Sequence, residues 1–70
     1  MITRDPKILL GKPIIKGTRI SVELIMRKLA SGYSIEQVLS NYPHLTLAQI
    51  QVCFEYTANL IADEQIVELA

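Results

Sequence analysis

Few residues of this 70-residue chain have the chemistry of a catalytic or metal site. His44 is the single histidine and Cys53 the single cysteine, so the chain has neither a Cys/His zinc cluster nor an intrachain disulfide. The carboxylates are scattered, and no pair has the spacing expected for acid–base catalysis. Gly11, Gly17 and Gly32 do not form a phosphate-binding loop. We therefore expect no catalytic residue, no bound metal, no cofactor and no enzymatic activity.

The charged residues indicate binding instead, because they are divided between the two parts of the chain. Residues 1–28 hold seven basic and two acidic residues, a net charge of +5, whereas residues 29–70 hold five acidic and no basic residues, a net charge of −5. Such a split predicts two surfaces with different partners, although solvated charges distributed by chance are an alternative. Neutralisation of phosphate dominates affinity for nucleic acid. The candidate nucleic-acid-binding residues are therefore Lys16, Arg19, Arg27 and Lys28.

We expect one domain in three parts, and residues 1–20 form a basic, extended segment in this interpretation. Prolines at positions 6 and 13 disfavour helix at the residues before them. Two short β segments, Ile14-Ile15 and Arg19-Ile20, are predicted on either side of a turn, where Gly17 adopts a positive φ at little steric cost. This part is expected to present basic side chains beside a helical core.

Residues 21–62 are predicted to form that core as three helices. Ser21 is a plausible N-cap for the first helix, which Gly32 ends. Ser34 and Thr46 are each followed three residues later by glutamine, the pattern of a capping box at a helix start. The resulting fold class is mainly α, a tri-helical helix-turn-helix (homeodomain-like or winged-helix-like) with a short N-terminal β segment.

The third predicted helix has two apolar sides. The helical period assigns one side to the core: Leu47, Ile50, Phe54, Thr57, Ala58 and Ile61. The opposite side carries Val52, Cys53, Tyr56 and Leu60. A domain of this size has few elements that can cover both apolar sides of the helix. We therefore predict a homodimer with Val52, Tyr56 and Leu60 in or near the contact. The alternative is that the N-terminal β segment folds over this second side.

Residues 63–70 are predicted to be an acidic, amphipathic segment. Asp63 either continues the third helix or caps a separate turn, and acidic residues alternate with apolar ones. Ile66, Val67 and Leu69 are candidates for docking onto a protein partner, and packing on a second copy is the alternative.

The N-terminus lacks the long apolar run of a signal peptide or a membrane span. Arg4, Asp5 and Lys7 interrupt it, and no apolar run approaches the ~20 residues that cross a bilayer. We therefore expect a cytoplasmic protein with no membrane partner and a reduced thiol at Cys53.

Several local motifs resemble one bacterial family. The segment Gly11-Lys12-Pro13-Ile14-Ile15-Lys16-Gly17-Thr18-Arg19-Ile20-Ser21-Val22, together with Gly32-Tyr33-Ser34, Tyr42-Pro43-His44-Leu45-Thr46 and Ile50, is similar to the "domain of unknown function 433" family over about residues 2–61. Ser21 stands where this family often has proline, and both residues suit a helix start.

The resemblance implies a helix-turn-helix fold and a specific pair of partners. Many members look like VapB-type antitoxins, encoded beside a PIN-like ribonuclease. It therefore implies an antitoxin of a type II toxin–antitoxin pair that neutralises this toxin and binds its own promoter DNA. A stand-alone DNA-binding regulator and an interaction module without nucleic acid are the alternatives. The recurring Gly17-Thr18-Arg19 unit implies that Arg19 contacts phosphate, a partner carboxylate or Glu23 of its own chain.

Overall fold

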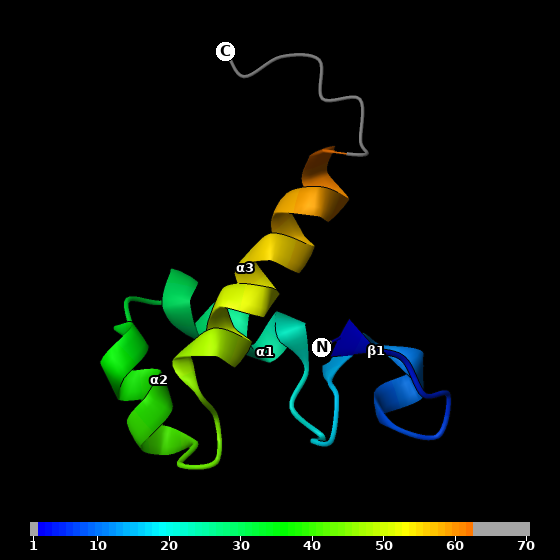
Figure 1. The fold of residues 1–70 in the computed structure, drawn as a ribbon, viewed down its shortest axis with the longest axis horizontal. Helices are drawn as coiled ribbons and strands as arrows, with labels where there is room; N and C mark the ends of the chain where they lie inside the picture. Colours follow the sequence, from blue (N-terminus) through cyan, green and yellow to red (C-terminus); the bar gives the residue numbers. More distant parts are fainter. Residues whose placement is uncertain (1, 63–70) are drawn as a thin grey trace.

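Residues 2–62 fold as a two-stranded antiparallel sheet and three α-helices (Figure 1). The computed structural model describes residues 2–62. Along the chain the elements are β1 (Ile2–Thr3), a 3₁₀ turn (Leu9–Gly11), β2 (Ile14–Ile15), α1 (Val22–Ala30), α2 (Ile35–Asn41) and α3 (Leu47–Ala62). The predicted fold class is confirmed: the protein is mainly helical, and a short β segment precedes the helices.

The predicted strand Ile14-Ile15 is present as β2, but its partner strand was not predicted from the sequence. β2 pairs with β1, in the register Ile2 opposite Ile15 and Thr3 opposite Ile14. The expected second β segment, Arg19-Ile20, was wrong, because only a single bridge between Ile14 and Ser21 forms there. The chain still reverses after β2 as predicted, and the Ile15 N–H donates to the Ile20 carbonyl at 2.9 Å.

All three helices start at the predicted residues, because each start carries its own cap. The Ser21 hydroxyl accepts from the Leu24 N–H at 3.0 Å. Ser34 and Gln37 form a complete capping box, with the Ser34 hydroxyl accepting from the Gln37 N–H at 3.0 Å and the Gln37 side chain accepting from the Ser34 N–H at 2.8 Å. The Gln49 side chain likewise accepts from the Thr46 N–H at 2.9 Å. These bonds satisfy amide groups that a helix start leaves without partners.

The core lies where β2, the three helices and the loop before α3 meet. Its buried side chains form one cluster: Ile15, Val22, Ile25, Val38, Leu45, Ile50 and Cys53. β1 and Tyr56 of α3 pack against this cluster from outside. β1 thus covers one side of α3.

The side of α3 that faces the core differs from the prediction. Ile50 and Cys53 are buried, whereas Leu47 is 49% and Ile61 53% exposed, and Phe54 is exposed as well. The expected core face was therefore wrong except at Ile50, with Thr57 half-buried at its edge. The reason is β1, which contacts α3 and covers the side that carries Tyr56.

α3 is also the longest element, and its C-terminal part projects away from α1 and α2 (Figure 1). Within residues 2–62, no helix combines the length and the apolar character needed to cross a membrane.

Candidate nucleic-acid interface

The turn of residues 16–19 holds two exposed basic side chains, Lys16 and Arg19, on a braced backbone. Thr18 is the brace: its N–H and its hydroxyl both donate to the Ile15 carbonyl, at 3.0 and 2.7 Å. The same hydroxyl accepts from the Ile20 N–H at 3.0 Å. Gly17 has φ of 84°, a conformation that strains an L side chain. The turn therefore holds Lys16 and Arg19 in a fixed relation to the core.

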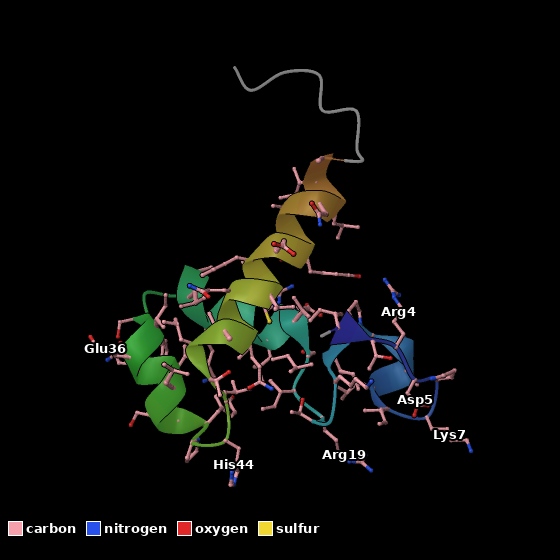
Figure 2. All side chains as sticks on the ribbon, viewed as in Figure 1. Arg4, Asp5, Lys7, Arg19, Glu36 and His44 are labelled. Atoms are coloured by element: carbon pink, nitrogen blue, oxygen red, sulfur yellow. The ribbon has the colours of Figure 1, made fainter. Side chains whose placement is uncertain are left out.

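This turn lies at the end of the molecule where α3 begins. Figure 2 shows Arg19 and His44 projecting from the same edge, opposite the C-terminal end of α3, with Lys7 at the side of that edge. His44 belongs to the loop that joins α2 to α3. The start of the second helix of a helix-turn-helix is the part that approaches DNA in proteins that read the major groove. We call Lys7, Lys16 and Arg19 the basic edge.

Basic residues near Glu23 form ion pairs with its carboxylate, whereas within residues 2–62 the turn of residues 16–19 has no such pairs. Glu23 pairs with Lys12 at 2.9 Å and with Arg27 at 2.8 Å. In the part of the chain that the structure describes, Lys16 and Arg19 have no carboxylate within ion-pair distance. Their charges are therefore available to phosphate without first breaking an intramolecular ion pair.

Two of the four predicted nucleic-acid-binding residues, Arg27 and Lys28, make contacts within the chain. The hydrogen bond from Lys12, and then that from Arg27, hold the pKa of Glu23 below its ordinary value. Glu23 pairs with Lys12 and Arg27, and the expected contact between Arg19 and Glu23 is not formed. Lys28 lies with its Nζ 4.6 Å from the centre of the Tyr33 ring. The structure thus places Lys16 and Arg19 on the turn after β2, and Arg27 and Lys28 on α1.

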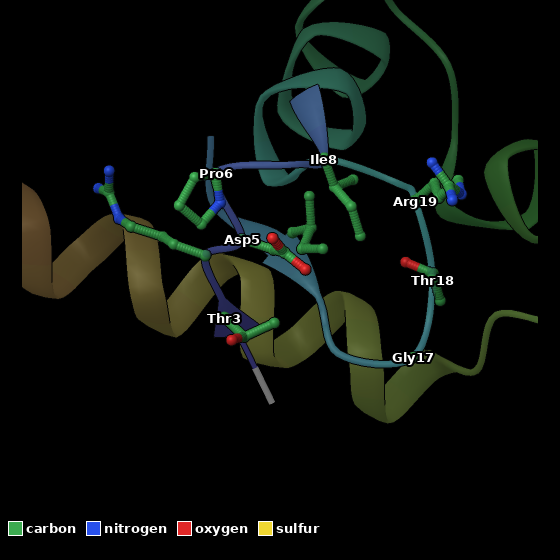
Figure 3. Close-up of a pocket in the computed structure, with 9 residues that line it drawn as sticks. Thr3, Asp5, Pro6, Ile8, Gly17, Thr18 and Arg19 are labelled. Carbon is green, nitrogen blue, oxygen red and sulfur yellow. The ribbon is translucent and has the colours of Figure 1, made fainter. Parts of the chain in front are cut away.

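A hollow of about 610 Å³ lies beside the turn, bordered by the chain after β1 (Figure 3). Ile8 and Ile14 form part of its wall, and the half-buried Asp5 carboxylate lies at its centre, where it accepts from the Lys7 N–H at 2.9 Å. A carboxylate in this position repels phosphate. Anion contacts are therefore expected on the outer rim, where Arg19 lies, and not inside the hollow.

Arg4 turns to a different part of the molecule although its backbone borders the same hollow. Its guanidinium donates to the Tyr56 hydroxyl at 3.2 Å and to the Gly11 carbonyl at 3.5 Å. These bonds tie the N-terminal segment to α3. Sequence reasoning missed both the hollow and this tie, since they depend on the pairing of β1 with β2.

The surface of α3 itself offers little to nucleic acid. Glu55 is its one charged residue between Leu47 and Ala62. The Gln49 side-chain oxygen accepts from the Thr46 N–H at the start of the helix. Gln51 and Asn59 remain exposed and lie farther along the helix.

The residues predicted to contact other proteins are placed as follows. Val52 and Tyr56 are half-buried and border a small depression together with Ile2 of β1, whereas Leu60 is exposed. The predicted docking residues Ile66, Val67 and Leu69 lie outside the described residues.

Cys53 is buried in the core of the protein. Burial raises the pKa of the Cys53 thiol, so that it is neutral at physiological pH. Among residues 2–62, no three His, Cys, Asp or Glu side chains come together in a group able to hold a metal ion.

Comparison with known proteins gives one family and one relative. Residues 2–57 match the family model described as "Protein of unknown function (DUF433)". The chain is also similar to the uncharacterized protein y4eO of Sinorhizobium fredii, with 34% identity over 56 residues. Those residues are 80% of this chain and 25% of the relative, so the chain spans about a quarter of that protein's length. No solved structure matches the chain.

Proposed function

The chain belongs to the DUF433 family of proteins of unknown function, and from its surface we propose that it is a nucleic-acid-binding antitoxin. In this proposal the basic edge contacts the phosphates of promoter DNA, and another surface holds a PIN-like ribonuclease. The observation that carries the proposal is the braced turn with Lys16 and Arg19, which lies at the end of the helix-turn-helix where α3 begins.

The distribution of charge supports contacts with phosphate more than with base edges. Lys16 and Arg19 are exposed and lack intramolecular ion-pair partners among residues 2–62. Reading a base needs donors or acceptors in the groove, and α3 offers Gln51 and Asn59 but no arginine or lysine. Such an interface binds through the backbone, with strong salt dependence and modest sequence preference.

The antitoxin part of the proposal rests on family resemblance and on the charge split. Residues 29–70 carry only acidic charges, which complement the basic surface that a ribonuclease uses to hold RNA. Ile66, Val67 and Leu69 are the proposed apolar contacts in this part of the chain.

The nucleic-acid interface is tested by the salt dependence of binding to a labelled DNA duplex, measured by fluorescence anisotropy. Each phosphate contact contributes about 0.9 to the slope of log K against log salt. The double variant Lys16→Ala, Arg19→Ala should therefore flatten the slope by about 1.8. Arg27→Ala, Lys28→Ala removes the same charge from α1 and is the matched control, expected to change the slope less.

Two results would contradict this interface. One is an unchanged slope in the Lys16→Ala, Arg19→Ala variant. The other is a loss of affinity that follows Gln51→Ala, which would assign recognition to α3.

The antitoxin role is tested by co-expression with a PIN-like ribonuclease encoded next to this chain. The two proteins should co-purify, and RNA cleavage should stop when the chain is in excess. Uninhibited cleavage together with intact DNA binding would favour a stand-alone regulator.

A further inference from the structure

Four large apolar side chains of α3 are exposed, namely Leu47, Phe54, Leu60 and Ile61, and all of them except Leu60 follow a seven-residue spacing. Leu47, Phe54 and Ile61 are 49%, 38% and 53% exposed, and each lies seven positions from the next. Seven residues turn a helix to within about 20° of two full turns, so the three side chains form one stripe along its axis. Ala58 lies between Phe54 and Ile61 and allows another backbone to approach closely. We call these four residues the α3 stripe.

The α3 stripe has the properties of a helix-pairing surface. Apolar positions that repeat every seven residues stay on one side of a helix, and Ala58, four positions after Phe54, adds a second small apolar position to that side, as in helices that pack along one another. The one charge of α3, on Glu55, is next to Phe54 in sequence and lies about 100° around the helix from it. The C-terminal part of the helix projects clear of α1 and α2, so a partner helix has access to it (Figure 1).

We propose that the α3 stripe pairs antiparallel with the α3 stripe of a second copy of this chain. In a two-fold arrangement the same surface serves both copies. Phe54, the middle of the stripe, then meets Phe54 of the other copy, and Leu47 meets its Ile61. The pairing differs from the predicted contact through Val52, Tyr56 and Leu60. Val52 and Tyr56 lie beside Ile2 of β1, whereas Leu60 is exposed and directly precedes the α3 stripe residue Ile61 in the sequence.

Charge complementarity selects the second copy and the antiparallel direction. The basic edge lies at the end of the molecule where α3 begins. The residues after Ile61 in the sequence include Asp63, Glu64 and Glu68. An antiparallel pair brings the C-terminal end of α3, from which this acidic sequence follows, to the basic edge of the other copy, whereas a parallel pair brings the two C-terminal ends of α3 together.

The pairing does not depend on nucleic-acid binding, and its test uses the protein alone. Sedimentation equilibrium of the full chain should show a dimer at a protein concentration of ~100 μM. Phe54→Glu places two charges against each other at the two-fold axis and should raise the dimer dissociation constant by at least about thirtyfold, the effect of losing a central contact. The matched control is Leu24→Glu on α1, which is also 38% exposed and lies off the α3 stripe.

A monomeric wild-type chain would overturn the proposal, and so would an equal effect of Phe54→Glu and Leu24→Glu. Circular dichroism establishes that both variants keep their helices. The direction of pairing is tested separately by cysteine cross-linking in a Cys53→Ala background.

For the antiparallel pair, chains with Leu47→Cys should form disulfides with chains that carry Ile61→Cys. Ile61→Cys chains alone should not, because the two sulfurs then lie at opposite ends of the pair. Cross-linking of Ile61→Cys with itself, or no cross-link in the mixture, would contradict the arrangement.

Discussion

Two isoleucines of α3 test how this helix is oriented on the core. Ile50 is completely buried, whereas Ile61 is 53% exposed, and the helical period alone places both on one face. Truncation of Ile50 to alanine removes buried methyl and methylene groups and leaves a cavity, which costs about 2–5 kcal/mol. A domain of this length has a total stability of roughly 3.5–10 kcal/mol. Ile50→Ala should therefore remove a large part of the free energy of unfolding.

Ile61→Ala should behave differently, since little of its surface is removed from water. Alanine is also the better helix former by a few tenths of a kcal/mol, which offsets part of any lost contact. We expect a change within about 1 kcal/mol.

Urea denaturation followed by circular dichroism measures both variants, at protein concentrations where the chain is monomeric. Equal destabilisation by Ile50→Ala and Ile61→Ala would show that the C-terminal part of α3 also packs on the core, and it would refute the projection of this part beyond α1 and α2.

Three further predictions concern single side chains. Ser34→Ala breaks the capping box of α2 and should cost about 1 kcal/mol in chemical denaturation, with Ser40→Ala, which is exposed within the same helix, as the control. The lowered pKa of Glu23 means that its stabilisation is present above the ordinary value of 4.5 and is lost as pH falls through the lower folded value. Glu23→Gln should therefore flatten the decline of thermal stability in that acidic range, and an unchanged decline would contradict the ion pairs with Lys12 and Arg27. Cys53 is buried and its pKa is raised, so iodoacetamide should modify it at the rate of unfolding and much faster in urea; rapid modification of the native protein would place the thiol at the surface.

Local signals in the sequence predicted most of the helical framework. Ser21, Ser34 and Thr46 cap helices through atoms within three residues of themselves, so their effect is readable without the fold. The pairing of β1 with β2 was not readable in this way. It joins two-residue strands that lie 11 or more positions apart in the chain, and such short strands carry too little pattern to show their partner.

The missed strand also explains the error on α3. Both sides of this helix are apolar, so its period identifies two faces and does not indicate which one is covered. Ile2 of β1 packs beside Tyr56, so the side of α3 that carries Tyr56 is covered and Phe54 is exposed.

The basic edge was predictable in part for the same reasons. Gly17 marks the turn, and Lys16 and Arg19 flank it in the sequence. That Lys12 and Arg27 both converge on Glu23 required the structure, because Lys12 and Glu23 belong to different segments. The Asp5 carboxylate inside the adjoining hollow likewise required the strand pairing.

The most direct test of the central claim is an NMR titration of the isotope-labelled protein with a short DNA duplex at low salt. The account predicts that amide shifts concentrate in residues 16–19 and in the loop and first turn of α3, residues 44–49. It also predicts that these shifts fade as salt is added, since phosphate contacts carry the binding. Shifts that concentrate on the exposed middle of α3 around Gln51 and Glu55, or no shifts anywhere, would contradict it.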